Sequence, residues 1–251
     1  MSDWIDELLV AIELHSPERI RAAAAAGRSL ADPIRGKPAV DWLLEMYTRS
    51  DRFTECLSTL VGLGAEVAAP EALPVLLNDV QAIRARASAD AEWLGRRIFW
   101  RSAFTPLEGA TLLHVAAEYG HLAAARTLLE LGVDVNSRAA TDADGLNGHT
   151  PLFHTVNSNG NRSAPVMHLL LGAGARADLQ VSGITWGRGF EWETTCFDVT
   201  PVGYAQLGLL PQMHRKEQDI YENVRALLVA CGRSASAIRN VPNRYLSPTA
   251  S

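Results

Sequence analysis

Acidic and histidine side chains that could exchange protons lie in two separate stretches of the sequence. Three of them lie between residues 118 and 154, and three lie between residues 191 and 198. A carboxylate beside an imidazole forms an acid–base pair, which suffices for a proton transfer, a cyclisation, an elimination, an isomerisation or a hydrolysis. The candidate catalytic residues are Glu118, His149, His154, Glu191, Glu193 and Asp198.

Aromatic and polar residues that could form the wall of a ligand site accompany these groups. The stretch 183–198 combines four aromatic with four charged residues, a composition typical of small-molecule sites. Aromatic walls would raise a carboxyl pKa, whereas a nearby guanidinium would keep the carboxylate ionised and make a ligand clamp. A loop whose aromatic side chains pack on the loop itself would have the same composition. The candidate ligand-binding residues are Trp100, Tyr119, Asn157, Arg162, Trp186, Arg188, Trp192 and Tyr204.

A polar turn at 157–163 contains three asparagines and Arg162. The planar guanidinium of Arg162 could bind a carboxylate or a phosphate of a ligand, although a solvated turn without function is the simpler interpretation. His154 stands where an apolar helix residue is expected, so it is either a buried structural histidine or a catalytic one.

The common cofactor and metal motifs are incomplete. The segment Asp142-Ala143-Asp144-Gly145 places its glycine too early for a calcium loop and lacks the distal glutamate. Gly172-Ala173-Gly174 lacks the third glycine of a dinucleotide loop, and no phosphate-binding loop motif occurs. We therefore expect no metal and no cofactor.

Composition narrows the class of protein. The 251 residues carry a net charge of −5 and no long basic block, so we expect no nucleic-acid partner. No apolar run approaches ~18 residues, which argues against a membrane span. The three cysteines are far apart, as in a reducing compartment, and the cytoplasm is the expected location.

Internal repetition supplies the elements that would position these side chains. Residues 109–136 open with Gly-Ala-Thr-Leu-Leu-His-Val-Ala-Ala and end with Leu-Leu-Glu-Leu-Gly-Val-Asp-Val-Asn. This segment resembles the ankyrin repeat nearly position for position. Weaker copies run through 148–175 and 200–232. In such a repeat the threonine caps the first helix, small alanines allow close helix packing, and Gly120 permits the turn between helices.

The resemblance implies an all-α fold, an ankyrin-repeat solenoid of about six helix-turn-helix units with long β-hairpin or loop fingers. One such domain would cover 1–251, because a single unit cannot bury its apolar face alone. The approximate units are 4–30, 38–67, 70–94, 95–136, 147–178 and 198–235.

The spacing between successive repeats exceeds the usual repeat length at two places. From Thr111 to Thr150 is 39 residues and from Thr150 to Thr200 is 50, where the family's repeat has about 33. The extra residues form finger insertions at 137–147 and 179–197. A further finger is expected before Thr111, because residues 96–101 and 103–105 alternate like two strands. The resemblance also implies that Glu118, Tyr119 and His149 face the groove beneath these fingers.

Two classes of function follow. The first is a binding protein that uses the concave groove and enlarged fingers to bind a protein, a peptide or a small molecule. The second is a cofactor-independent enzyme with acid–base chemistry in a pocket under residues 181–198. Long fingers around a single repeat favour a local site, but binding is the usual role of proteins that resemble this one. We expect a monomer.

Overall fold

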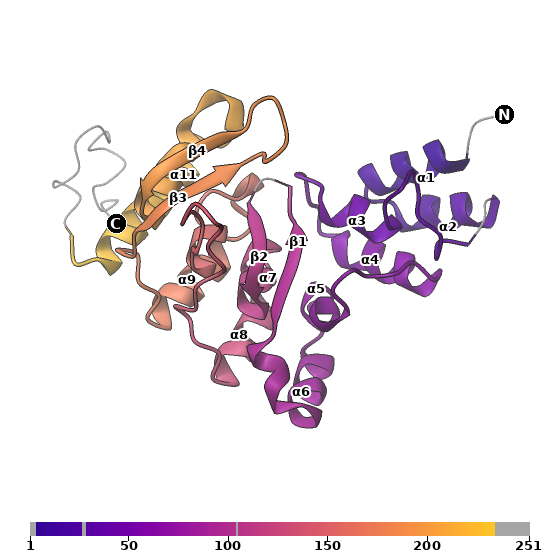
Figure 1. Cartoon of the computed structure of the whole chain (residues 1–251), viewed down its shortest axis with the longest axis horizontal. Coiled ribbons are helices and arrows are strands. Elements are labelled where there is room, and N and C mark those ends of the chain that lie inside the picture. Colours follow the sequence, from indigo (N-terminus) through magenta and orange to yellow (C-terminus); the bar gives the residue numbers. More distant parts are fainter. Residues whose placement is uncertain (1–3, 27–28, 104, 234–251) are drawn as a thin grey trace, which may run out of the picture.

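The computed structural model describes residues 4–26, 29–103 and 105–233, which form short helices and two pairs of strands (Figure 1). The α-helices are α1 (Trp4–Glu13), α2 (Pro17–Ala26), α3 (Ala39–Leu44), α4 (Phe53–Gly62), α5 (Leu73–Leu76), α6 (Val80–Ala89), α7 (Leu112–Glu118), α8 (Leu122–Glu130), α9 (Ala164–Gly172), α10 (Pro201–Gln206) and α11 (Glu217–Ala230). The 3-10 helices are η1 (Pro70–Ala72), η2 (Ala91–Gly95), η3 (Pro151–His154), η4 (Asn159–Asn161), η5 (Leu207–Leu209) and η6 (Pro211–Met213).

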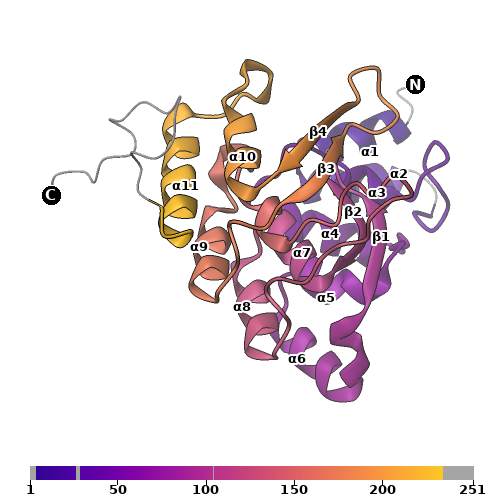
Figure 2. The same ribbon diagram turned by 60° about the vertical axis from the view of Figure 1, so that its left-hand side comes forward.

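Helices that follow one another in sequence pack together and share one core. α1 contacts α2, α3 contacts α4, α7 contacts α8, and α10 contacts α11. Figure 2 shows α6, α8, α9 and α11 following one another along one edge of the molecule, in agreement with their contacts. The buried apolar residues form a continuous cluster that runs from Leu8 in α1 to Leu228 in α11. The chain therefore builds its core by adding helices in sequence order.

α7 shows why this segment is helical and closely packed. The Thr111 hydroxyl accepts a hydrogen bond from the backbone N–H of His114, and the Thr111 N–H donates to His114 Nδ1 at 3.1 Å. This reciprocal cap satisfies donors that a helix start leaves free. Ala116 and Ala117 are fully buried, because their small side chains let neighbouring helices approach. The His114 ring also hydrogen-bonds to the carbonyl of His149 at 3.0 Å, so it is a structural residue.

The strands form two separate antiparallel pairs. β1 (Arg97–Arg101) pairs with β2 (Pro106–Thr111), and β3 (Val181–Trp186) pairs with β4 (Thr194–Val199). The β1–β2 ladder is irregular between Ile98 and Phe99. The alternation at 96–101 thus forms a strand, but its partner begins at Pro106 rather than at Ala103.

The segment 137–147 joins the two strand pairs. The N–H of Ala140 donates to the carbonyl of Glu108 in β2, at 3.2 Å, and the N–H of Asn147 donates to the carbonyl of Gly183 in β3, at 2.7 Å. Backbone hydrogen bonds therefore tie the fingers into one assembly over α7.

The predicted all-α ankyrin-repeat solenoid of about six units is wrong. About half of the chain is helical, and two antiparallel strand pairs make the fold mixed α/β. Residues 97–101 and 181–186 satisfy their backbone groups by pairing with 106–111 and 194–199 in antiparallel ladders. The copy that starts at Thr150 opens with the 3-10 helix η3 instead of a full α-helix. The predicted units 4–30, 95–136 and 198–235 include residues 27–28, 104 and 234–235, which lie outside the described residues.

Gly109 is the position where this assembly tolerates least change. Its φ is +62°, and an added Cβ would lie 2.4 Å from the Cβ of Ala140. We expect Gly109→Ala to lower the free energy of unfolding by more than about 1 kcal/mol, measured by chemical denaturation. Gly62 is the matched control, because a Cβ there meets nothing within 4 Å and lies in a helix. Gly62→Ala should be neutral or stabilising, and equal losses in both variants would contradict this account.

Candidate functional site

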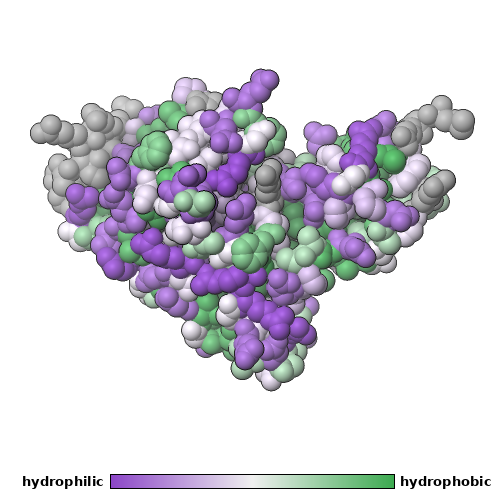
Figure 3. Space-filling view, in the orientation of Figure 1, coloured by the Kyte–Doolittle hydropathy of each residue, from purple (hydrophilic) through white to green (hydrophobic). Residues whose placement is uncertain are grey.

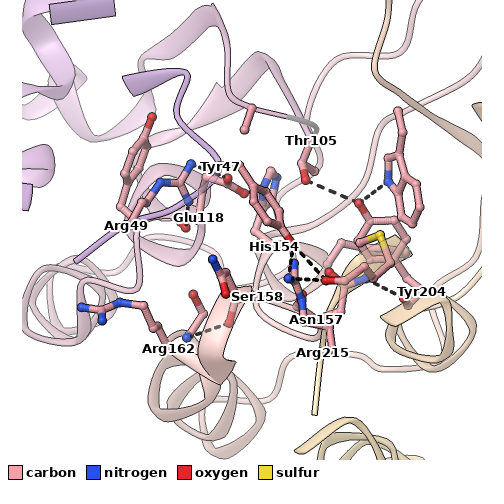
Figure 4. Close-up of a pocket in the computed structure, with 17 residues that line it drawn as sticks. Tyr47, Arg49, Thr105, Glu118, His154, Asn157, Ser158, Arg162, Tyr204 and Arg215 are labelled. Carbon is pink, nitrogen blue, oxygen red and sulfur yellow. Dashed lines mark hydrogen bonds and ion pairs between the residues drawn. The ribbon is translucent and has the colours of Figure 1, made fainter. Parts of the chain in front are cut away.

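A cavity lies where the end of α7 meets η3, β3, α10 and four further segments of the chain, which contribute Tyr47 with Arg49, Ala103 with Thr105, residues 157–159 with 162–163, and Met213 with Arg215. The space between its lining side chains measures about 670 Å³ including open solvent, and the part that the centre of a water-sized molecule can occupy is about 70 Å³. Figure 3 shows a notch in the molecular surface between the part that contains α1–α4 and the part that carries β3 and β4. Figure 4 shows side chains that line the cavity, with Arg49, Glu118 and His154 near one another and Tyr204 farther along the wall.

Glu118, at the end of α7, is the buried charge of the cavity wall. Its Oε1 accepts hydrogen bonds from Arg49 Nη2 at 2.9 Å and from Ser102 Oγ at 2.6 Å. Its Oε2 accepts from His154 Nδ1 at 2.7 Å. Arg49 also donates to the backbone carbonyl of Glu118 at 2.8 Å, and its guanidinium stacks 4.2 Å from the Tyr119 ring centroid. Both carboxylate oxygens are thus used inside the protein.

The hydrogen bonds continue from His154 to His149 and fix their tautomers. His149 Nε2 lies 3.1 Å from the carbonyl oxygen of Pro106, which can only accept, so His149 carries its proton on Nε2. His154 Nε2, 2.9 Å away, then accepts from His149, and His154 donates its Nδ1 proton to Glu118. The result is a one-directional chain of hydrogen bonds through two imidazoles that ends on a carboxylate.

Burial and charge set the ionisation of this chain. Burial opposes ionisation of Glu118, but the Arg49 charge and the hydrogen bonds from His154 and Ser102 outweigh it and hold the Glu118 pKa well below its usual range. Burial, together with the neighbouring His154, lowers the pKa of His149 to about 3. Neutral His149 and ionised Glu118 are therefore the forms present at neutral pH.

Aromatic residues form another part of the wall. Trp186 Nε1 donates to the Tyr204 hydroxyl at 2.6 Å, and the Tyr204 ring centroid lies 5.7 Å from that of Phe153. Burial raises the pKa of Tyr204, so its phenol stays protonated. In this part of the wall each ring packs against another ring, and the Trp186 Nε1 and the Tyr204 hydroxyl are hydrogen-bonded to each other.

The remaining lining is polar and positively charged. Arg215 donates from Nε to the carbonyl of Asn157 at 2.6 Å and also bonds to the Tyr47 hydroxyl and the Met213 carbonyl. Arg162 lies in the turn before α9 and pairs with Asp51 on the surface. The Asn157 side chain donates to the Tyr204 carbonyl at 2.9 Å, which anchors this turn to α10.

Several sequence-predicted site residues lie elsewhere. Glu191, Glu193, Asp198 and Trp192 are exposed in or beside the β3–β4 hairpin and do not line this cavity. Trp192 stacks on Phe190 with centroids 5.2 Å apart, the Glu193 carboxylate accepts the Gly189 N–H, and Asp198 accepts from Gln180. Arg188 pairs with Asp142 at 2.7 Å, and Trp100 is half-buried in β1. The hairpin tip thus packs on itself, apart from the Glu118 chain.

The structure does bring together Glu118, His149 and His154, and it lines the cavity with Tyr119, Asn157, Arg162, Trp186 and Tyr204. Sequence reasoning missed Arg49, Ser102, Tyr47 and Arg215, all of which contact or line the same site. None of these four stands at a position that the repeat motif specifies, and no sequence signal singled them out.

Comparison with family models concerns the segment that contains α7 and α8. Residues 108–140 match the family model described as Ankyrin repeat. Over these residues the chain is similar to an ankyrin repeat. The match covers α7 and α8 and supports an ankyrin-repeat family, but it is a single repeat where six were expected. No curated protein matches the chain.

Two further observations concern the described part of the chain. Among residues 4–26, 29–103 and 105–233, no helix combines the length and apolar character needed to cross a bilayer. Within the same ranges, no group of three or more His, Cys, Asp or Glu side chains is arranged to hold a metal ion.

Removal of the buried carboxylate should be costly. Glu118→Ala leaves Arg49 buried without its partner, so we expect the free energy of unfolding to fall by roughly 3–5 kcal/mol in chemical denaturation. The control is Glu130→Ala, which removes a half-exposed ion pair with Arg84 and should cost less than about 1 kcal/mol. Similar losses in the two variants would show that the Glu118 contacts contribute little.

Stability should also fall on acidification. Folded His149 titrates at about 3 rather than 6.5, so the unfolded chain binds more protons between these values and stability decreases as pH falls from 6.5 towards 3. We expect up to about 1.4 kcal/mol per pH unit from this residue. His149→Gln should flatten the dependence between pH 6.5 and 5, whereas replacement of the exposed His168 by Gln should not. An unchanged slope in His149→Gln would contradict this assignment.

Proposed function

We propose that this chain binds a protein partner and that the cavity beside Glu118 receives a side chain or chain end of that partner. Ankyrin repeats mediate contacts between proteins, so the match over 108–140 indicates a protein-interaction role. The observation that carries the finer proposal is the position of the cavity, which opens beside Glu118 and Tyr119 where α7 ends in the matched repeat.

The state of the polar groups supports binding over catalysis. A general base needs a free lone pair directed at its substrate. Glu118 uses both oxygens for Arg49, Ser102 and His154, and His154 uses both ring nitrogens for Glu118 and His149. Acid–base chemistry by His154 would require one of these bonds to be exchanged for a substrate. The lowered pKa of Glu118 makes its carboxylate a weak base, and His149 Nδ1, which has no hydrogen-bond partner, is buried outside the cavity lining.

The cavity wall has the character of a recognition pocket. Aromatic rings of Phe153, Trp186 and Tyr204 offer an apolar surface, and the turn at 157–163 offers half-buried amide and hydroxyl groups together with the exposed Arg162. An aromatic surface with a few polar groups is what anchors a partner's side chain. The exposed candidates Glu191, Glu193 and Trp192 lie outside this pocket and would contact a partner only at its periphery.

A peptide-display selection tests the proposal. Peptides enriched on the unmodified protein should bind Ala103→Leu at least roughly tenfold more weakly, because the larger side chain fills the half-buried lining position. Ala143→Leu is the matched control, since Ala143 is exposed and does not line the cavity. Each variant is first checked for the circular dichroism spectrum and unfolding transition of the unmodified chain.

Three outcomes of these experiments would contradict the proposal. Selected peptides that bind the Ala103 variant as well as they bind the unmodified chain would refute the cavity as the binding site. A failure to enrich any peptide would refute peptide binding. Turnover of a small molecule that is lost in Glu118→Gln, with binding retained, would favour the enzymatic alternative.

A further inference from the structure

We propose that the outer edge of β4 pairs with an extended, basic segment of a partner protein. This inference goes beyond the proposed function, because it concerns a surface apart from the cavity and needs no ligand there. It gives a role to Glu191, Glu193 and Asp198, which line no part of that cavity. The mode of binding is the addition of a strand to a sheet edge, in which main-chain hydrogen bonds supply the affinity.

β3 has neighbours on both sides, whereas β4 has a neighbour on one side. β3 pairs with β4, and on its other side the N–H of Asn147 donates to the carbonyl of Gly183 at 2.7 Å. Within residues 4–26, 29–103 and 105–233, the backbone of 194–199 forms no backbone hydrogen bond except those with β3. Figure 1 and Figure 2 both show β4 on the outer side of β3, at the upper margin of the molecule. Over the described chain, the outer edge of β4 is therefore open.

The bond from Asn147 also determines which backbone groups of β4 point outward. The N–H and C=O of a strand residue point to the same side, so both groups of Gly183 point away from β4. Gly183 lies opposite Phe197 in a non-hydrogen-bonded pair, so Phe197 directs its N–H and C=O away from β3. Thr195, opposite Thr185, does the same. The two threonine hydroxyls lie 2.9 Å apart, in agreement, because side chains are closer in such pairs.

Phe197 adds an apolar surface beside these main-chain groups. The residue is 69% exposed, and its Cδ1 lies 3.5 Å from the position that a Cβ of Gly183 would take. The ring therefore covers the glycine on one side and leaves most of its surface to solvent. Side chains of neighbouring strands contact one another, so an added strand would pack a side chain on this ring.

The charge around the edge favours a basic segment. Glu191, Glu193 and Asp198 are exposed, and none of them forms an ion pair with another residue of the described chain. Arg188, the cation of the hairpin, is paired with Asp142 at 2.7 Å and does not compensate them. Opposite charges on adjacent strands are stabilising and like charges are destabilising. A basic segment is thus favoured over a second copy of β4, which would bring the same carboxylates together.

β1 is the other outer strand, and it is a less regular edge. Phe99 in β1 is 70% exposed, but the ladder with β2 is irregular between Ile98 and Phe99. Such an irregularity bends a strand and interrupts its row of outward main-chain groups, which protects an edge from pairing. β4 pairs with β3 in unbroken register from Thr194 to Phe197. We therefore assign the docking edge to β4.

Fluorescence anisotropy with synthetic peptides tests the inference. The probe is a capped peptide of about eight alternating lysine and valine residues, long enough to form one strand. A glutamate–valine peptide is the charge control, and a lysine–valine peptide methylated at every backbone nitrogen keeps the charge but donates no main-chain hydrogen bond. We expect the unmethylated lysine peptide to bind at least roughly tenfold more tightly than either control. Equal binding of the three peptides, or no binding of the lysine peptide, would overturn the inference.

Two variants at Phe197 separate the main chain from the ring. Phe197→Pro removes the outward N–H, and proline is tolerated at an edge where its nitrogen faces away from the ladder. Phe197→Ala removes the ring and keeps the N–H. We expect the proline variant to lose roughly tenfold or more in affinity and the alanine variant only a few-fold. Equal losses would overturn main-chain pairing. If the circular dichroism spectrum shows that Phe197→Pro does not fold, the methylated peptide decides the same point.

Variants of the carboxylates test the charge. We expect Glu193→Gln and Asp198→Asn each to weaken binding of the lysine peptide several-fold, because each removes one negative charge beside the edge. The amide of Gln can still accept the N–H of Gly189 that the Glu193 carboxylate accepts. Glu66→Gln is the matched control, since Glu66 is exposed after α4 and should leave the affinity unchanged. Unchanged affinity in both hairpin variants would contradict the basic character of the segment.

The cavity variant Ala103→Leu separates this inference from the proposed function. Binding of the lysine peptide that is lost in Phe197→Pro and kept in Ala103→Leu would support the edge, whatever the cavity binds. Binding that is kept in Phe197→Pro and lost in Ala103→Leu would place the peptide in the cavity and overturn the inference. Self-association in sedimentation velocity that disappears in Phe197→Pro would assign the edge to a second copy of the chain and would also overturn it.

Discussion

A carboxylate removed from water must have its charge and its lone pairs compensated, and Glu118 imposes that requirement on the whole site. Arg49 compensates the charge from the segment after α3, Ser102 contributes from the segment between β1 and β2, and His154 contributes from η3. These residues are distant in sequence. The geometry of the cavity wall therefore depends on N-terminal helices, a strand pair and the matched repeat at once, and none of them forms the wall alone.

Local patterns in the sequence predict local structure well, and α7 with α8 shows it. The threonine cap, the paired alanines and the turn glycine specify those helices within a short segment, and the family match covers the same residues. The all-α solenoid was wrong because pairing between 97–101 and 106–111, and between 181–186 and 194–199, adds strands. The residue pattern of the repeat describes helices and turns, so it does not predict how the residues inserted between repeats pair with each other.

The residues of the candidate site also differ in whether the sequence predicts them. Glu118 and Tyr119 could be named because the repeat places them before the turn, and His154 because it interrupts an apolar pattern. Arg49 and Arg215 could not, since their partners are reached only through the tertiary fold. Glu191 and Trp192 have suitable chemistry, but the hairpin turns back on itself beyond Trp186: the Trp186 ring is buried against Tyr204, whereas the Trp192 ring lies over Gly187 near solvent. Composition alone does not distinguish these two tryptophans.

Tyr47 and Arg215 join segments that are 168 residues apart in the chain. Closing so long a loop has a large entropic cost, and that cost falls only after the intervening helices have packed. Such a contact has high sequence separation, so it belongs to the late part of folding. During synthesis on the ribosome, the cavity accordingly stays incomplete until nearly the whole described chain has emerged, and shorter nascent chains contain the matched repeat without the complete cavity wall.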